Sequence, residues 1–522
     1  MANLFEQKDR RVMPNWRSFS RTLNLGELRY PKKISESKDK TNLSIEDYLL
    51  DWEGSKSVSV AGDLISAAFV NGFIDNEKVK EAAKYILKNK KKATDSLVSI
   101  VQIILESTSK DPKNNFFIKK FKKFDPSDCH IEINKYKKLI NNYPYNPIVY
   151  VDLSRLYAVL GLEKKSIKNM KIALHLAPGN RFVLRAAARL FSHFRQLEYI
   201  HDLIRKSELV NIDPWITSTE IALATILDKR SKYIKTGLSM INSANYAWNN
   251  LTELASSIGT LEFLNGNRKK AKKYLKMAII SPNENSLAQI EWINNRDLLL
   301  DINPSDYDIN NNYEALALYK YVKQDYKTAF NQCKEWFCDL PFSKRPVLFG
   351  SHIAGSLLDK QGDAIEFLQA GVCSNPRDAE IINDLAYYLA IENKIQNAEK
   401  YMRQITDIPD ISTNTKICLT ATQGLIFFRK GKISEGIDLY EKAIMSAKSL
   451  NNNHFIWLAK LNFARELILS ASALKLTIEN LVLKIPDNTK FHDVNKLKRE
   501  VIDLYKKNSN ILPQKGSVVY NP

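Results

Sequence analysis

Glycine and proline are scarce in this sequence, and a long hydrophobic run is missing. Only 17 Gly and 17 Pro occur in 522 residues, which argues against an all-β protein with many tight turns and favours helices. The most apolar stretch, residues 58–73, is interrupted by Asp63 and is shorter than the roughly 20 residues of a membrane span. The first 30 residues contain no apolar signal-peptide core. These absences predict a helical, cytoplasmic protein without a membrane segment.

Motifs for catalysis or metal binding are also missing. The five cysteines are odd in number and scattered, which predicts reduced thiols rather than a disulfide framework. Cys333 and Cys338 are five positions apart and would point about 140° away from each other on a helix. The sequence contains no phosphate-binding loop, no H-E-x-x-H, no paired C-x-x-C and no G-x-S-x-G. We therefore expect no metal, no cofactor and no enzymatic activity.

The net charge of +19 is denser toward the two ends of the chain. Residues 1–130 hold 24 basic and 18 acidic residues, and residues 484–522 hold 8 and 4, whereas residues 131–483 hold 45 and 36. Such an excess favours association with acidic partners through long-range attraction, but it identifies no specific activity.

A helical hairpin is the clearest pattern that the sequence does contain, and it begins at Pro147. Apolar or small residues recur at i, i+3, i+4 and i+7 from Tyr150, which is the stripe of an α-helix. Gly161 fits the turn and Pro178 ends the second helix. Small residues at the points of helix contact allow an approach of about 8 Å. In this first unit they are Ser154, Ser166 and Ala173.

The same layout recurs along the chain. Residues 286–309 break the phase and are expected to form an inserted helix and loop. Residues 215–251 fit a degenerate unit with two short helices. The other recurrences cover 181–214, 252–285, 310–341, 345–376, 379–410 and 417–448.

This pattern resembles the tetratricopeptide repeat (TPR), a helix–turn–helix unit of about 34 residues with small residues at fixed offsets. The resemblance covers about 147–448 and consists of degenerate repeats, because the hallmark tryptophan and Leu-Gly pairs are mostly replaced. It implies an all-α fold, an α-solenoid in which the hairpins form a right-handed superhelix, with a small helical N-terminal domain.

Four regions are expected from this reading. Residues 1–57 form a basic polar extension, although Trp16 and its apolar neighbours suit docking on the solenoid or on a partner. Residues 58–130 form a small helical domain that caps the array. Residues 131–483 form the superhelical array, and residues 484–522 form a C-terminal helix and a loose tail.

A concave groove lined by the first helices is what the resemblance implies for binding. Its N-terminal half would be cationic and its later half aromatic and aliphatic, which suits a peptide, helix or partner domain with an acidic group at one end. The same residues could instead pack against the inserted helix or the N-terminal extension. The candidates are Arg155, Arg185, Arg189, His193, Phe263, Tyr321, Phe349, Asn383, Tyr387, Phe428 and Arg429.

Three basic runs, at 88–92, 118–124 and 268–276, leave a second function open. In the last run Ala271 and Leu275 fall on the inward stripe of the helix, so its lysines are expected on a solvated convex face. The favoured function is a non-catalytic protein-interaction scaffold. The alternatives are a nucleic-acid-binding or regulatory protein that uses the basic ends and convex faces, and a regulatory subunit of a bacterial toxin or defence complex.

Overall fold

The computed structural model describes residues 12–18, 45–71, 76–107, 126–243, 245–405, 408, 411–472 and 475–508. Within these ranges the regular elements are all helices, and no strand occurs. The all-α class expected from the sequence is therefore confirmed. The basic run at 118–124 and the tail at 509–522 lie outside the described residues.

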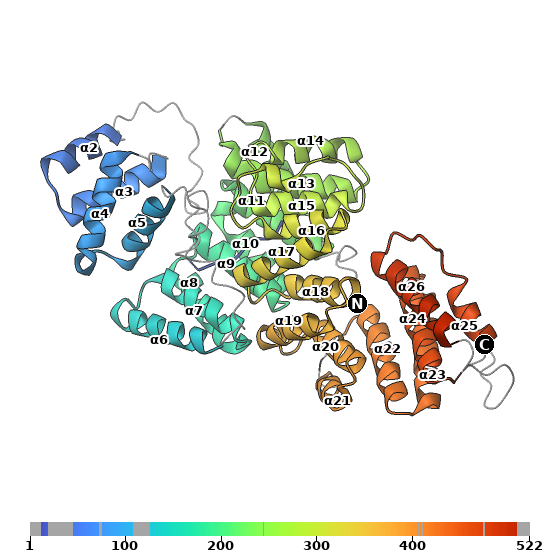
Figure 1. Ribbon diagram of the computed structural model, residues 1–522. Coiled ribbons are helices and arrows are strands. Elements are labelled where there is room, and N and C mark those ends of the chain that lie inside the picture. Colours follow the sequence, from blue (N-terminus) through green and yellow to red (C-terminus); the bar gives the residue numbers. More distant parts are fainter. Residues whose placement is uncertain are drawn as a thin grey trace.

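Four helices near the N-terminus form a group of their own (Figure 1). Their core is built around Trp52, Leu64, Ala83 and Ile104, all nearly inaccessible to solvent. Because Trp52 belongs to the first of the four helices, the group begins before the boundary expected at residue 58. The helices are α2 (Ile45–Gly54), α3 (Val58–Asn71), α4 (Glu77–Lys88) and α5 (Asp95–Ser107).

Helical hairpins stacked side by side make up most of the chain (Figure 1). They fall where the repeat spacing predicts them, and the expected inserted helix is α15 (Glu284–Asn294). The hairpins are α7 (Pro147–Val159) with α8 (Glu163–Leu176), α9 (Arg181–His193) with α10 (Leu197–Lys206), α11 (Pro214–Ile226) with α12 (Ile234–Asn242), α13 (Trp248–Leu264) with α14 (Arg268–Ala278), α16 (Tyr313–Val322) with α17 (Tyr326–Asp339), α18 (Lys344–His352) with α19 (Gln361–Ser374), α20 (Ala379–Ile391) with α21 (Ile395–Gln404), and α22 (Thr413–Arg429) with α23 (Ile433–Ser449).

Local sequence explains where the hairpin helices begin and turn. The side chain of Asn146 caps α7 by accepting the backbone N–H of Ile148, and Pro147 occupies the first helical position. The hairpin turns place one residue in the left-handed region, which glycine adopts without steric cost. Its φ is +67° at Gly161, +59° at Arg195, +79° at Gly266, +60° at Gln324, +58° at Asn393 and +76° at Gly431.

The small residues of the first hairpin lie at its closest contact. Ser154 Oγ donates to the carbonyl oxygen of Ser166 at 2.8 Å, and Ser166 Oγ donates to the carbonyl oxygen of Ser154 at 2.7 Å. Ala173, about two helical turns further along α8 than Ser166, is completely buried. The two helices therefore approach closely enough for side-chain hydroxyls to bond the opposite backbone.

Enlarging Ala173 tests this register. We expect Ala173→Leu to lower the free energy of unfolding by about 1–3 kcal/mol, because the added carbons must displace packed neighbours. Lys164→Leu, at an exposed position of the same helix, should change it by less than about 0.5 kcal/mol. Urea unfolding of both variants measures the difference, and equal stabilities would contradict the assigned register.

The array curves until its first hairpin contacts a much later one. Ser374 Oγ, at the end of α19, lies 2.8 Å from the carbonyl oxygen of Val159 in the first hairpin. A Cβ at Gly161 would lie 2.7 Å from the carbonyl oxygen of Cys373 and 2.9 Å from Pro376. Hairpins separated by about 200 residues therefore touch.

The basic run at 268–276 forms most of α14. Ala271 and Leu275 are buried, whereas Lys269, Lys272 and Lys276 are exposed. The inward stripe is thus apolar and the cations face water, as the helical period predicts.

The C-terminal helices fold back onto the array. α24 (Asn453–Leu469) stacks on α22, and α26 (His492–Asn508) packs on α24 and on a π-helical turn, η5 (Ile353–Leu357). The expected C-terminal helix is thus part of the packed array. At the other end α6 (Pro126–Asn142) covers α7, and α25 (Lys475–Val482) follows α24. Across the described ranges, no helix combines the length and apolar character that crossing a membrane requires.

Candidate functional site

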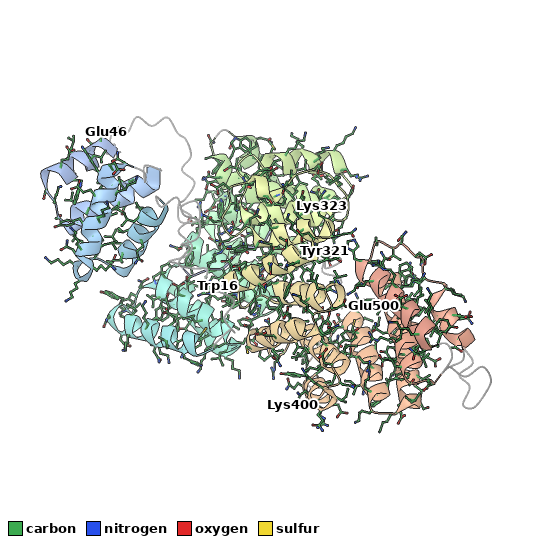
Figure 2. The ribbon with its side chains drawn as sticks, in the orientation of Figure 1. Trp16, Glu46, Tyr321, Lys323, Lys400 and Glu500 are labelled. Atoms are coloured by element: carbon green, nitrogen blue, oxygen red, sulfur yellow. The ribbon has the colours of Figure 1, made fainter. Side chains whose placement is uncertain are left out.

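Residues 12–18 lie inside the N-terminal half of the array, and we call this segment the strap. Trp16 is 1% exposed, and its ring lies 5.3 Å from that of Phe342, which connects α17 to α18. Figure 2 shows Trp16 at the centre of the molecule, among the helices of the array. The strap therefore occupies the interior that a ligand would otherwise enter.

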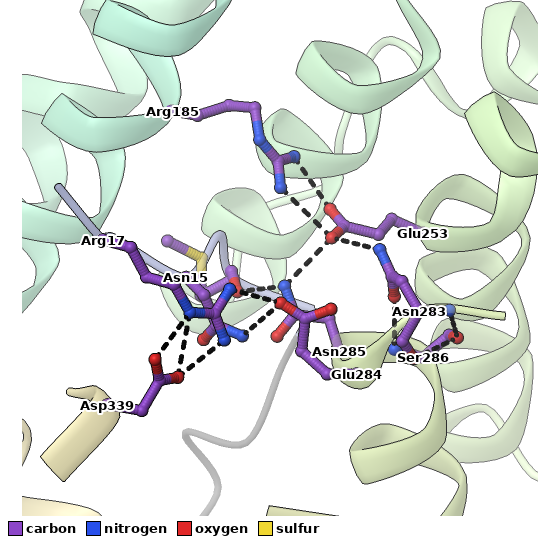
Figure 3. A network of polar contacts seen from close by, with 10 residues as sticks. Asn15, Arg17, Arg185, Glu253, Asn283, Glu284, Asn285, Ser286 and Asp339 are labelled. Atoms are coloured by element: carbon purple, nitrogen blue, oxygen red, sulfur yellow. Dashed lines mark hydrogen bonds and ion pairs between the residues drawn. The ribbon is translucent and has the colours of Figure 1, made fainter. Parts of the chain in front are cut away.

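A buried ion pair fixes the strap to the inserted helix α15 and to α17 (Figure 3). Arg17 Nε lies 2.9 Å from both carboxylate oxygens of Asp339, and Arg17 Nη1 donates to Glu284 Oε1 at 2.6 Å. Burial alone would raise the pKa of Glu284, but the Arg17 cation and its hydrogen bond hold that pKa below the ordinary value. The carbonyl oxygen of Met13 accepts a hydrogen bond from Asn285.

The cationic residues expected in the N-terminal groove are engaged within the protein. Arg185 is 3% exposed and donates to both oxygens of Glu253, at 2.8 and 3.1 Å. Arg189 donates to Ser343 Oγ at 3.3 Å and lies over the ring of Phe342. Carboxylates and rings of this chain thus hold the charges that were expected to face an acidic partner.

Most of the remaining groove candidates pack against other parts of the chain. The start of α26 covers Tyr321, whose ring stacks on that of His492 with the ring centroids 5.2 Å apart. Arg429 pairs with Glu466 at 2.8 Å. The others are placed as follows: Arg155 is half-buried on α7, His193 lies against Phe342, Phe263 lies partly buried beside α14 and α15, Phe349 is buried beside Tyr321, and Phe428 is buried between Tyr440 and Phe463.

Asn383 and Tyr387 are the two candidates that the structure brings together at a pocket. The first helices α20, α22 and α24 stack side by side, and residues from each, with others from η5 and α26, line a cavity of about 120 Å³. Its walls combine apolar side chains such as Ile391 and Leu458 with polar groups. The volume suits one side chain of a ligand, because a cavity of about 150 Å³ holds a benzene molecule.

Hydrogen bonds fix the polar groups of the pocket wall. Thr422 Oγ1 donates to Asn383 Oδ1 at 2.9 Å, and Asn383 Nδ2 donates to Asp384 Oδ1 at 3.1 Å. Tyr387 OH donates to Asn462 Oδ1 at 3.0 Å. Because these side chains come from three stacked helices, the array sets their positions before any ligand arrives.

Carboxylates at the rim are paired inside the protein. His454 Nε2 lies 2.9 Å and 3.1 Å from the two oxygens of Asp493, on the C-terminal helix. Burial alone would raise the pKa of Asp493, but His454, His352 and the backbone N–H of Val494 together bring it well below its ordinary range. Lys496 pairs with Asp359 and, at 3.4 Å, with Glu500. Figure 2 shows Glu500 on α26, facing the array.

Several pocket residues escape a reading of the sequence alone. Asp384 was detectable, because α20 reads AEIINDLAYYLAI and places the polar pair Asn383 and Asp384 between apolar residues in the middle of the helix. No comparable signal marks Asp493, which reaches the pocket only because α26 folds back. Nowhere in the part of the chain that the structure describes do three or more His, Cys, Asp or Glu residues converge as a metal site would require.

The stacked hairpins define a helical-repeat protein. No family model matches the chain, and no curated protein matches it. The assignment therefore rests on the hairpins themselves.

Comparison with solved structures finds chains that are similar at low sequence identity, among them the following. The APC/C hetero-tetramer Cut9–Hcn1 has 12% identity and a TM-score of 0.38, with 89% of this chain and 92% of that chain covered. The human IFIT1 dimer with PPP-AAAA has 13% identity and a TM-score of 0.31, with 74% of this chain and 95% of that chain covered. Yeast Tom70 has 13% identity and a TM-score of 0.31, with 90% of this chain and 97% of that chain covered.

Proposed function

We propose that this protein is a non-catalytic scaffold that binds a segment of a partner protein on the concave face of α20, α22 and α24. The observation that supports the proposal is the contrast between the two halves of the array. The strap fills the N-terminal interior, whereas the C-terminal hairpins carry a pocket with fixed polar groups. Binding there costs little ordering entropy, because the helices already hold the contact groups in place.

The charges of the pocket change the kind of partner expected. Arg185 is neutralised by Glu253, and Arg189 is engaged by Ser343 and by the ring of Phe342, so they offer little to an acidic segment. The pocket is lined instead by four carboxylates and one arginine, which are Asp359, Asp384, Asp493, Glu500 and Arg465. Electrostatic complementarity therefore favours a partner segment with a basic rather than an acidic group.

Filling the pocket tests the proposal. Ala421 lines the cavity, and Ala421→Trp should occupy much of its volume. We expect affinity purification from the native cells, quantified by mass spectrometry, to recover discrete partners with the unmodified chain and to lose them with this variant.

Ala247→Trp is the matched control, since Ala247 is exposed and outside the pocket. It should retain the same partners at unchanged yield. If the two tryptophan variants recover identical sets of proteins, the pocket is not the binding surface and the proposal is wrong.

A further inference from the structure

The strap fixes the chain inside the array close to its start. Val12, Met13 and Pro14 are buried, and the carbonyl oxygen of Met13 accepts a hydrogen bond from Asn285. Residues 1–11 precede this fixed point and lie outside the described residues. Any site that they bind must be within their reach of Val12, and a fully extended segment of this length spans at most about 36–40 Å.

The pocket of α20, α22 and α24 is within that reach. Trp16 of the strap contacts Phe342, which immediately precedes α18. At the other end of α18, η5 contributes Gly355 and Ser356 to the cavity wall. At a helical rise of about 1.5 Å per residue, the path from Phe342 to Gly355 is about 20 Å. Residues 1–11 are therefore long enough to extend from the strap to the pocket.

The chemistry of residues 1–11 complements that of the pocket. The cavity is lined by four carboxylates and one arginine. Residues 1–11 contain three basic and two acidic side chains, and the amino group adds a further positive charge. Their apolar members Leu4 and Phe5 suit the walls formed by Ile391 and Leu458. Opposite charge and apolar contact thus favour the same occupant.

Two titratable groups of the cavity wall respond to a positive charge of this chain. Asp384 is 3% exposed, and its Oδ1 accepts a hydrogen bond from Asn383 at 3.1 Å. Burial raises the pKa of Asp384 to about 6, and the foremost group opposing this rise is the chain's own amino terminus. The same charge opposes the rise that burial causes in the pKa of Cys418, on α22. This is the effect expected of a cation bound at the pocket.

Arg465 offers a docked segment a hydrogen-bond donor. It shares the carboxylate of Glu466 with Arg429, at 3.0 and 2.8 Å. Its Nη2 is buried and has no hydrogen-bond partner among the described residues. A buried donor is costly when it stays unsatisfied. A backbone carbonyl oxygen of residues 1–11 would satisfy this donor.

We infer that residues 1–11 of this chain dock in the pocket, and that a partner segment must displace them in order to bind. This inference concerns the regulation of the site and rests on the proposed function. Because the strap holds the chain at Val12, docking is intramolecular, and a short tether gives an effective concentration on the order of 1 mM. A segment with a Kd of about 1 mM would then fill the pocket about half of the time.

Disulfide trapping in the full chain tests the docking. Ala2→Cys places a thiol within residues 1–11, and Cys418 supplies a second thiol from the cavity wall. The variant is oxidised mildly and digested with trypsin. We expect mass spectrometry to find residues 1–8 joined to residues 417–429 by a disulfide.

A second position and the other thiols of the chain make this result decisive. Asn3→Cys repeats the trap one residue further along, and Cys418→Ser removes the pocket thiol. Because a disulfide requires Cα atoms within about 7 Å, linkage to Cys418 should exceed linkage to the exposed Cys338 and Cys373 at least about tenfold. No linkage to Cys418 from either position, or no preference for it over the exposed thiols, would overturn the inference.

Partner capture tests the displacement. Oxidation of the Ala2→Cys chain should nearly abolish capture, because a covalently held occupant cannot leave the pocket, and reduction should restore it. In the same chain Ala421→Trp should suppress the disulfide by filling the cavity. Ala247→Trp, outside the cavity, should leave the disulfide unchanged.

The docking and the scaffold proposal fail in different ways. If the disulfide forms but capture ignores both oxidation and Ala421→Trp, the docking stands and the scaffold proposal falls. If capture is lost with Ala421→Trp but no disulfide to Cys418 forms, the scaffold proposal survives and the docking falls. If the disulfide forms and Ala421→Trp abolishes capture while oxidation leaves capture unchanged, residues 1–11 do not compete with the partner and the displacement is disproved.

Discussion

Arg17→Ala is expected to lower the free energy of unfolding by about 3–5 kcal/mol, because removing one member of a buried ion pair leaves its partners uncompensated. Asp339 is 2% exposed and faces Arg17 with both oxygens. Glu284 pairs with the same guanidinium group, which holds the pKa of this carboxyl group below its ordinary value. The substitution therefore strands two carboxylates inside the array.

Urea unfolding followed by circular dichroism measures this effect. Arg403→Ala is the control, since the Arg403 side chain is 82% exposed, and such a change costs less than about 0.5 kcal/mol. Native-state hydrogen exchange should locate the loss in the helices that contact the strap, namely the start of α15 and the end of α17. Equal midpoints for the two variants would mean that the strap contributes nothing to the fold.

The helical hairpins were predictable because their information is local. A first helix and its second helix are neighbours in sequence, and their contacts depend on small residues at fixed spacing, such as Ser154 and Ser166. The turn needs one left-handed residue, which glycine supplies at Gly161 but which Gln324 and Asn393 also adopt. Sequence therefore indicates the units even where the glycine is replaced.

The contents of the groove were not predictable, because they depend on curvature. Arg185 on α9 was expected to face a ligand, yet it bonds Glu253, 68 residues further along. The bond from Arg17 to Asp339 spans 322 residues. Such distances are set by the summed rotation of many hairpins, which no pattern within one repeat records.

The residues of the pocket were predictable in part. Asn383 and Tyr387 were expected in the groove and line the cavity, since both lie on α20. Asp384, which lines the same cavity, is next to them but was not selected. Asp493 and Glu500 come from α26, whose packing against α24 follows no repeat rule.

Asp493→Ala is expected to destabilise the C-terminal part of the array by about 3–5 kcal/mol. Asp493 is 4% exposed, and both of its oxygens face His454 Nε2. Its loss leaves a buried imidazole without its partner and releases α26 from α24. Asp503→Ala, at an exposed position of the same helix, is the control and should be nearly neutral.

The effect of Asp493 has a defined pH dependence. The pKa of this carboxyl group is lower in the folded protein than its ordinary value of 3.8, because His454, His352 and the backbone N–H of Val494 together more than offset the effect of burial. A depressed pKa stabilises the fold above the ordinary value, and this contribution disappears as the pH falls toward the folded value. The stability difference between the unmodified chain and Asp493→Ala should therefore be present above about pH 4 and shrink below it. A difference that stays constant from pH 6 to pH 3 would show that Asp493 acts through packing rather than through its charge, and α26 would then be held to the pocket by its apolar contacts alone.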